Sequence, residues 1–203
     1  MKIAVTGASG QAGSRITAEL AGRGHQVTAI ARTPERIVPA AGVTAIKGEA
    51  RDRAALTKLW TGQDVAISAI HFLASDPETL IGAAKDSGVG RYLVVGGAGS
   101  LEIAPGVRLV TTPSFPPQYR AEAEKGAAFL DRLGQERELN WTFLSPSALF
   151  VAGERTGKFR LGTDQLLTAT DGRSWISFED FAVALADEIE RPVHRRARFT
   201  VGY

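Results

Sequence analysis

A glycine-rich loop directly after the first apolar run constrains the fold more than any other feature of this chain. The run is Lys2 to Thr6, and it leads straight into Gly7-Ala8-Ser9-Gly10-Gln11-Ala12-Gly13. Three glycines at this spacing allow a sharp turn out of a strand, close approach of a ligand to the backbone and tight packing of the next helix. Because the loop lies between a predicted strand and a predicted helix, it predicts a dinucleotide-binding loop rather than an ordinary glycine-rich turn.

All seven residues of this loop are predicted to contact the cofactor. The N–H groups and the positive dipole end of the following helix would face its pyrophosphate. These cofactor-binding candidates are Gly7, Ala8, Ser9, Gly10, Gln11, Ala12 and Gly13.

The rest of the chain alternates short β-like runs with helix-like segments. This pattern predicts an α/β fold, a doubly wound parallel sheet of the Rossmann type. The predicted strands are residues 2–6, 25–30, 43–47, 64–70, 91–95, 141–144 and 198–201. The predicted helices are residues 11–23, a helix starting at Thr33-Pro34, then 52–60, 76–88, 118–137 and 177–190. At 203 residues, we expect one dinucleotide-binding domain over 1–203 with a small C-terminal substrate lobe.

Two segments break the alternation and are expected on the substrate side, at about 97–118 and 145–175. The stretch from Gly96 to Pro117 holds four glycines and four prolines, which predicts a long loop over the site. The stretch from Ser145 to Trp175 predicts loops and short hairpins, with Asp171-Gly172 as a turn.

Composition excludes several classes of function. The chain has no cysteine, which excludes thiol catalysis and Cys-ligated metal, and its three histidines are too scattered for a metal site. A net charge of +2 does not indicate nucleic-acid binding, and the basic run Arg191 to Arg198 is typical of a solvated connection. With no membrane-length apolar run or signal-peptide core, we expect a cytoplasmic monomer or homodimer that acts on a small molecule.

Arg32 indicates the form of the cofactor. It follows Gly13 by nineteen residues, at the tip of the second predicted strand. NAD sites usually carry an acidic residue there, whereas an arginine can bind the 2′-phosphate of NADP, so NADPH is preferred over NADH. The alternative is a solvated arginine before a helix. Thr33 would add a hydroxyl to this site or act as an N-cap.

These motifs together resemble a known family. The Gly7 to Gly13 loop, Arg32, the Gly96-Gly97-Ala98-Gly99-Ser100 turn and the Trp141 to Pro146 strand end are similar to those of atypical short-chain dehydrogenase/reductases. Within these, the chain resembles the NADH-flavin reductase group, related to NmrA-like and biliverdin-reductase-B-like proteins. The resemblance implies that Pro146 and Ser147 border the nicotinamide. We expect Ala69, Ile70, Gly96 and Ser145, also at strand ends, to contact the cofactor.

The proton-donating pair of typical short-chain dehydrogenases is missing. That pair is a Tyr with a Lys one helical turn later, which lowers the phenol pKa. Tyr119 has Ala123 at that place, and Lys125 faces elsewhere on the helix. Neither Tyr92 nor Tyr203 has such a partner.

The remaining catalytic candidates are His71 and Ser100, which follow the fourth and fifth predicted strands. His71 would donate a proton or stack on a ring, or it is simply solvated. Ser100 would bind substrate or merely end a turn. Phe115 and Tyr119 would cover a flat aromatic substrate or pack in the core.

Two functions fit these residues. The first is an NADPH-dependent reductase that passes a hydride to a flavin-like or quinone-like acceptor, with flavin as substrate, since such an acceptor needs no Tyr–Lys pair. The second is a non-catalytic sensor of NADP(H), like NmrA-type regulators, which would signal by reshaping the 96–118 loop.

Overall fold

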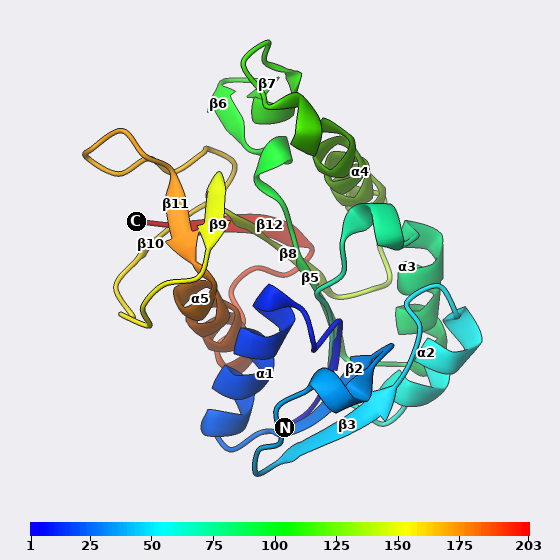
Figure 1. The fold of residues 1–203 in the computed structure, drawn as a ribbon. Coiled ribbons are helices and arrows are strands. Elements are labelled where there is room, and N and C mark those ends of the chain that lie inside the picture. Colours follow the sequence, from blue (N-terminus) through cyan, green and yellow to red (C-terminus); the bar gives the residue numbers. More distant parts are fainter.

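The computed structural model describes residues 1–203 and contains one eight-stranded sheet with helices on both faces (Figure 1). Its strand order is β10-β12-β8-β5-β4-β1-β2-β3. These strands are β1 (Lys2–Thr6), β2 (Gln26–Ala31), β3 (Val43–Lys47), β4 (Val65–Ser68), β5 (Arg91–Val95), β8 (Trp141–Pro146), β10 (Arg160–Gly162) and β12 (Ala197–Gly202). The helices are α1 (Gln11–Gly22), α2 (Arg53–Trp60), α3 (Pro77–Ser87), α4 (Pro117–Gly134) and α5 (Phe178–Glu190). The predicted doubly wound α/β fold is confirmed.

The order of the strands creates a crevice at the carboxyl ends of β1 and β4. Strand β1 pairs in parallel with β2 on one side and with β4 on the other. The chain first moves outward to β3, then returns to β4 and continues through β5, β8 and β12 in the opposite direction. At such a reversal the two connecting loops leave the sheet on opposite sides, and open α/β sheets bind ligands there.

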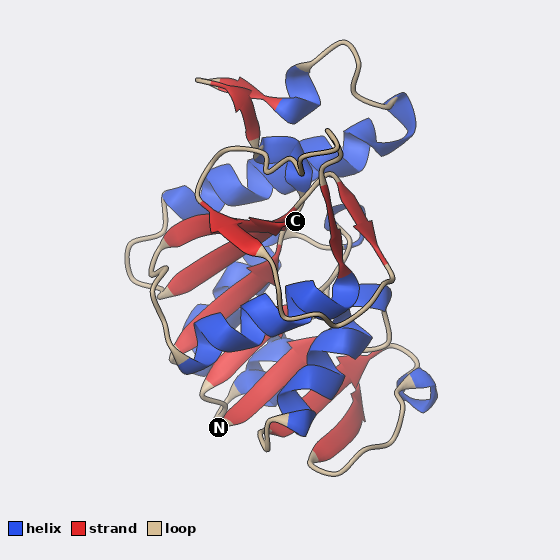
Figure 2. Ribbon diagram, turned by 90° about the vertical axis from the view of Figure 1, so that its left-hand side faces the viewer, coloured by secondary structure: helices blue, strands red, loops and turns tan.

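Successive residues of the buried strands alternate between two separate hydrophobic cores, one on each face of the sheet. Ile3 and Val5 face a cluster that contains α1 and α5, whereas Ala4 faces a cluster that contains α2, α3 and α4. Figure 2 shows the helices on both sides of the sheet. Because successive strand residues point to opposite faces, a run of consecutive apolar residues is what a two-sided sheet requires. None of the helices combines the length and apolar character needed to cross a bilayer.

Three of the predicted helix starts are confirmed by their caps. The carboxylates of Asp52 and Asp76 accept the N–H groups of Ala55 and Thr79 at 2.9 and 2.8 Å. The Ser177 hydroxyl accepts the N–H of Asp180 at 3.0 Å. Each bond satisfies a donor that the first turn of a helix leaves free.

The helix predicted to start at Thr33-Pro34 begins at Pro34 but is very short. Only one 3-10 turn forms there, over Pro34–Arg36, and the Thr33 side chain caps nothing. Pro39 explains the stop, since a proline disfavours helical backbone at the residue before it. Helix α4 also ends at Gly134, three residues before the predicted end.

The segment after β5 is more ordered than the predicted loop. It holds the 3-10 turns Ala98–Ser100 (η3) and Leu109–Thr111 (η4) and a hairpin of β6 (Glu102–Ala104) with β7 (Val107–Arg108). Pro105-Gly106 makes the hairpin turn, where Gly106 adopts a φ of +74° that favours glycine. The hairpin projects beside α4 (Figure 1).

The segment after β8 does not form the predicted local hairpins. Strands β9 (Leu149–Val151) and β11 (Trp175–Ser177) pair in parallel with each other, and β10 pairs antiparallel with β12. Each short strand thus finds its partner far along the chain. This part of the expected C-terminal lobe extends the main sheet through β10.

A buried ionic cluster lies at the edge of the sheet opposite the crevice, where β5 begins and α5 ends. Glu188 binds the Arg91 guanidinium at 2.9 Å and the His194 ring at 2.8 Å, and it also accepts the N–H groups of Val193 and His194. The Glu188 and Arg91 side chains are only 4% and 9% exposed. The His194 ring stacks on Phe199 at 4.1 Å, so the basic run is not fully solvated.

We expect Glu188→Ala to lower the free energy of unfolding by about 3–5 kcal/mol, because Arg91 would remain buried without its anion. Glu188→Gln, which keeps an acceptor oxygen, should lose less. Urea unfolding measures both. The control is Glu124→Ala on exposed α4 surface, which should stay within about 0.5 kcal/mol of the unchanged protein. Equal stability of Glu188→Ala and the control would contradict the assigned role.

Candidate functional site

The glycine loop after β1 forms a cradle in which two glycines are required by packing and one is not. Gly7 has a φ of +89°, and a methyl group on it would lie 2.3 Å from the Ala69 carbonyl. A methyl on Gly13 would lie 2.1 Å from the Gly7 carbonyl. A methyl on Gly10 would meet only the Gly7 carbonyl, at 3.2 Å. The first and third glycines therefore hold α1 against the sheet, and the second keeps the space above the helix open.

This space suits an anion. Helix α1 begins at Gln11 with no side-chain cap and no acidic residue in its first turn. Its first N–H groups and positive dipole end are thus available to phosphate oxygens.

A pocket at the crevice collects the ends of four strands. We call it the cofactor pocket, after the dinucleotide that the sequence predicts here. It is lined by Thr6, Gly7, Ser9, Gly10, Ile30, Ala31, Arg32, Gly48, Glu49, Ala50, Ala69, Ile70, His71 and Ala74. The set includes seven of the predicted site residues: Gly7, Ser9, Gly10, Arg32, Ala69, Ile70 and His71.

The other predicted residues near this pocket lie outside its lining. Ala8 and Gly13 are buried beneath it, and Gln11 and Ala12 lie on the first turn of α1. Thr33 is exposed and does not line the pocket.

Gly48, Glu49 and Ala50 were missed. They directly follow the third predicted strand, so the rule that ligands bind at carboxyl ends of strands could have found them.

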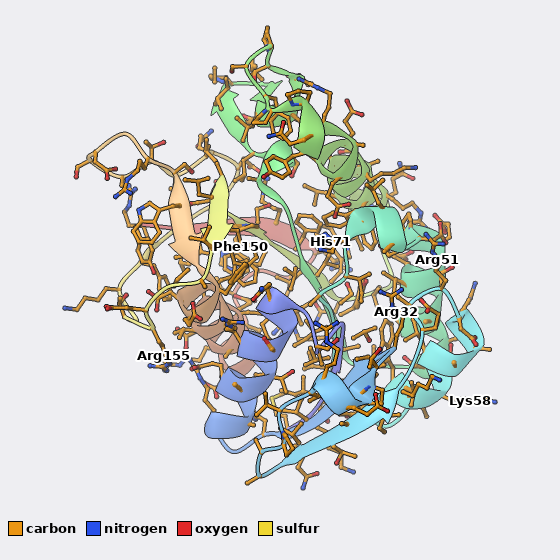
Figure 3. All side chains as sticks on the ribbon, viewed as in Figure 1. Arg32, Arg51, Lys58, His71, Phe150 and Arg155 are labelled. Carbon is orange, nitrogen blue, oxygen red and sulfur yellow. The ribbon has the colours of Figure 1, made fainter.

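Two arginines without carboxylate partners lie at this end of the sheet (Figure 3). Arg32 lines the pocket, is exposed and makes no ion pair. Arg51 donates only to the Leu73 carbonyl, at 3.1 Å. Cations left unpaired beside a cradle for phosphates provide positive charge for a further phosphate.

A second pocket lies beyond the ends of β5 and β8, and we call it the acceptor pocket after the hydride acceptor that the sequence predicts. Its volume is about 380 Å³, within the range of small-molecule sites. Aromatic and small residues dominate its lining: Phe72, Gly96, Gly97, Ala98, Gly99, Leu109, Ser114, Phe115, Pro116, Tyr119, Glu122, Ala123, Pro146, Ser147, Ala148, Leu149 and Phe150. His71 lines the cofactor pocket and Phe72 lines the acceptor pocket, so the two sites adjoin at this step of the chain.

Most of the residues predicted near the acceptor pocket line it, but Ser145 does not. Gly96, Pro146, Ser147, Phe115 and Tyr119 line it. Ser145 is fully buried behind its lining, with an unpartnered hydroxyl.

Ser100 is 3% exposed and lines neither pocket. Its hydroxyl accepts a long bond of 3.4 Å from Arg198. The 3-10 turn η3 places this hydroxyl inward, so the structure does not bring Ser100 to the site.

No Tyr–Lys pair forms at either pocket. Tyr119 is 62% exposed, and Ala123 one turn later packs against Gly99, where a methyl on Gly99 would lie 2.7 Å from the Ala123 Cβ. Burial raises the pKa of Tyr92, which bonds Ser68 away from the pockets. Burial also raises the pKa of Tyr203, which donates to Asp180. None of the three tyrosines has the cation that would prepare it as an acid.

Glu122 joins the two pockets and was missed by sequence reasoning. Its carboxylate accepts the N–H groups of Phe72 and Leu73 at 2.6 and 2.9 Å, and the His71 Nδ1 lies 3.3 Å away. It thereby fixes the 3-10 turn Phe72–Ala74 (η2) that follows the cofactor pocket. Nothing in the sequence near Glu122 indicates this contact, which spans 50 residues.

Comparison with known proteins shows the family of this chain. The family model described as NAD(P)H-binding matches residues 7–192 of this chain. The chain belongs to the NAD(P)H-binding family. The predicted similarity to atypical short-chain dehydrogenase/reductases is confirmed.

Relatives match along the whole chain. The uncharacterized protein YwnB of Bacillus subtilis (strain 168) is 39% identical over 208 residues, covering 99% of this chain and 98% of YwnB. A solved putative exported protein from Burkholderia pseudomallei is 43% identical over the whole of both chains, with a TM-score of 0.91. A solved putative NADH-flavin reductase from Streptococcus pneumoniae is 37% identical over 100% of this chain and 99% of that one, with a TM-score of 0.81. The cytoplasmic location stays a prediction.

The two kinds of glycine in the cradle should respond differently to substitution. We expect Gly10→Val to fold but to weaken NADPH binding at least about tenfold, because its side chain occupies the open space of the phosphates. Gly13→Ala should instead lower stability by about 2 kcal/mol or more, since its methyl meets the backbone. Circular dichroism, urea unfolding and calorimetric titration separate the two outcomes. Tight NADPH binding by folded Gly10→Val would count against the cradle as the phosphate site.

Proposed function

We propose that this protein is an NADPH-dependent reductase that transfers a hydride to a flat aromatic acceptor, a flavin or a quinone. The observation that carries the proposal is the apolar acceptor pocket adjoining the cofactor pocket, with aromatic rings in its lining and no Tyr–Lys pair. The description of the S. pneumoniae relative as a putative NADH-flavin reductase supports the same class of acceptor.

The chemistry balances without a dedicated acid. NADPH, when bound, supplies two electrons and one hydrogen as hydride, and the acceptor takes up one proton, which leaves NADP⁺ and the two-electron-reduced acceptor. Water can supply that proton, and so can His71, whose side chain is 89% exposed where the two pockets adjoin. A carbonyl acceptor would need a positioned acid in the transition state, which the tyrosines do not provide.

The chain's own residues have defined roles in this proposal. The α1 N-terminus and Gly10 hold the pyrophosphate, and Arg32 holds the 2′-phosphate. Pro146 and Gly96 border the nicotinamide, and the buried Ser145 hydroxyl beside them is left without a protein partner. Phe72, Phe115 and Phe150 supply apolar surface for the acceptor ring.

The test is NADPH oxidation with riboflavin, FMN, FAD and neutral quinones as acceptors. The loss of reduced-nicotinamide absorbance measures the rate. We expect turnover with at least one of them. Tight NADPH binding with no turnover on any acceptor would contradict the reductase and favour the NmrA-type sensor.

Arg32 should set the choice of cofactor. A charge-assisted contact with the 2′-phosphate is worth about 1.5–3 kcal/mol, so the protein should bind NADPH about ten to a hundred times more tightly than NADH. We expect Arg32→Gln to remove this difference by weakening NADPH alone. Arg36→Gln is the matched control, because Arg36 is also exposed and unpaired but does not line the pocket. Calorimetric titration giving equal affinities in the unchanged protein would refute the assignment.

Tyr119 in the acceptor pocket and His71 in the cofactor pocket should differ in importance. We expect Tyr119→Phe to change kcat by much less than the roughly 10²–10⁴-fold that loss of a general acid costs. His71→Ala should lower kcat several-fold, through proton supply or positioning. Steady-state rates with one acceptor at saturating NADPH measure both. A collapse of turnover in Tyr119→Phe alone would identify Tyr119 as the acid and a carbonyl compound as the substrate.

A further inference from the structure

The acceptor pocket carries a single charge. Of its 17 lining residues only Glu122 is ionisable at neutral pH, and none is Lys, Arg or His. Arg120, on the same helix, does not line the pocket, although its guanidinium lies 5.5 Å from the centre of the Phe115 ring, which does. Its guanidinium is held by the carbonyl groups of Val110, Thr112 and Phe115. A ligand in this pocket therefore meets one carboxylate and no compensating cation in the lining.

Glu122 cannot turn its carboxylate away without breaking the wall of the pocket. Both of its oxygens accept backbone N–H groups, from Phe72 and Leu73, and its side chain is only 30% exposed. The Phe72 ring that this contact positions packs against Gly126, where a methyl group would lie 2.7 Å from it. The third contact of the carboxylate is the His71 ring, whose Nδ1 lies 3.3 Å away and whose side chain is 89% exposed outside the lining of this pocket. Neutral N–H donors stabilise a carboxylate without removing its charge, so the charge stays at a fixed point beside the acceptor.

We propose that Glu122 sets the charge specificity of the acceptor pocket, so that an uncharged aromatic ring enters and a ring bearing its own anionic group is selected against. The inference rests on the proposed reductase function and names the substrate class of that site as neutral planar acceptors. Repulsion between like charges a few ångströms apart in a partly desolvated pocket is large enough to separate such compounds.

The test uses a neutral quinone and its sulfonate, 1,4-naphthoquinone and 1,4-naphthoquinone-2-sulfonate. Glu122→Gln keeps an oxygen that can accept an N–H group and removes the charge. Glu124→Gln is the matched control, since Glu124 lies on the same helix but is exposed and outside the pocket. The readout is the ratio of kcat/KM for the sulfonate to that for the neutral quinone. Comparing this ratio between variants cancels the different intrinsic reactivity of the two compounds.

We expect Glu122→Gln to raise the ratio about fivefold or more, and added salt to shrink that change. Glu124→Gln should leave the ratio within about twofold. An unchanged ratio in Glu122→Gln, with turnover present, would overturn the inference and leave the reductase proposal intact.

A binding experiment keeps the inference testable if no acceptor is reduced. Calorimetric titration of the same two quinones into the same three proteins needs no turnover. Preferential gain of sulfonate binding by Glu122→Gln supports the charge assignment even where the reductase proposal fails. Equal gains for both quinones, or none, would reject it.

Discussion

The Gly7 carbonyl oxygen packs so closely on Gly13 that the Cβ of any other residue at position 13 would lie only 2.1 Å from it. This contact brings the start of α1 down onto the end of β1. Helix α1 in turn packs on α5 across one face of the sheet, through the core that includes Ile16, Leu20 and Phe181. The same contact therefore fixes one face of the fold and directs the α1 N-terminus toward the crevice, so that folding and the proposed phosphate site share one geometric requirement.

Small residues play the corresponding part on the other face. Gly99 lies against Ala123 and Gly126 lies under Phe72, which lets α4 approach the ends of β4 and β5 closely. The position that holds a lysine in typical short-chain dehydrogenases is occupied here by Ala123, in that close contact. The packing of η3 on α4 fills the space that a lysine side chain at position 123 would need. The same packing therefore accounts for the missing Tyr–Lys pair and for the shape of the acceptor pocket.

Features that depend on local sequence could be predicted. Apolar runs predicted the sheet strands β1 to β5, β8 and β12. The caps at Asp52, Asp76 and Ser177 predicted three helix starts, and the glycine spacing predicted the cradle. Features that depend on distant pairing could not. The partners of β9, β10 and β11 lie far along the chain, and the contact of Glu122 with η2 spans 50 residues. The buried position of Ser100 could not be predicted for the same reason, because the packing around a turn decides which way its side chains point.

The two pockets on one sheet edge differ because different elements follow the strands. After β1 comes the N-terminus of α1, whose backbone N–H groups can bind phosphates whatever the helix side chains are. After β4, β5 and β8 come 3-10 turns, a hairpin and short strands, so the acceptor pocket is lined by side chains from segments that the sheet does not constrain. Substitutions in those segments can change the acceptor without disturbing the cradle. A shared cofactor therefore says little about the substrate of any one member of this family, and the charge and shape of the acceptor pocket must be determined for each chain.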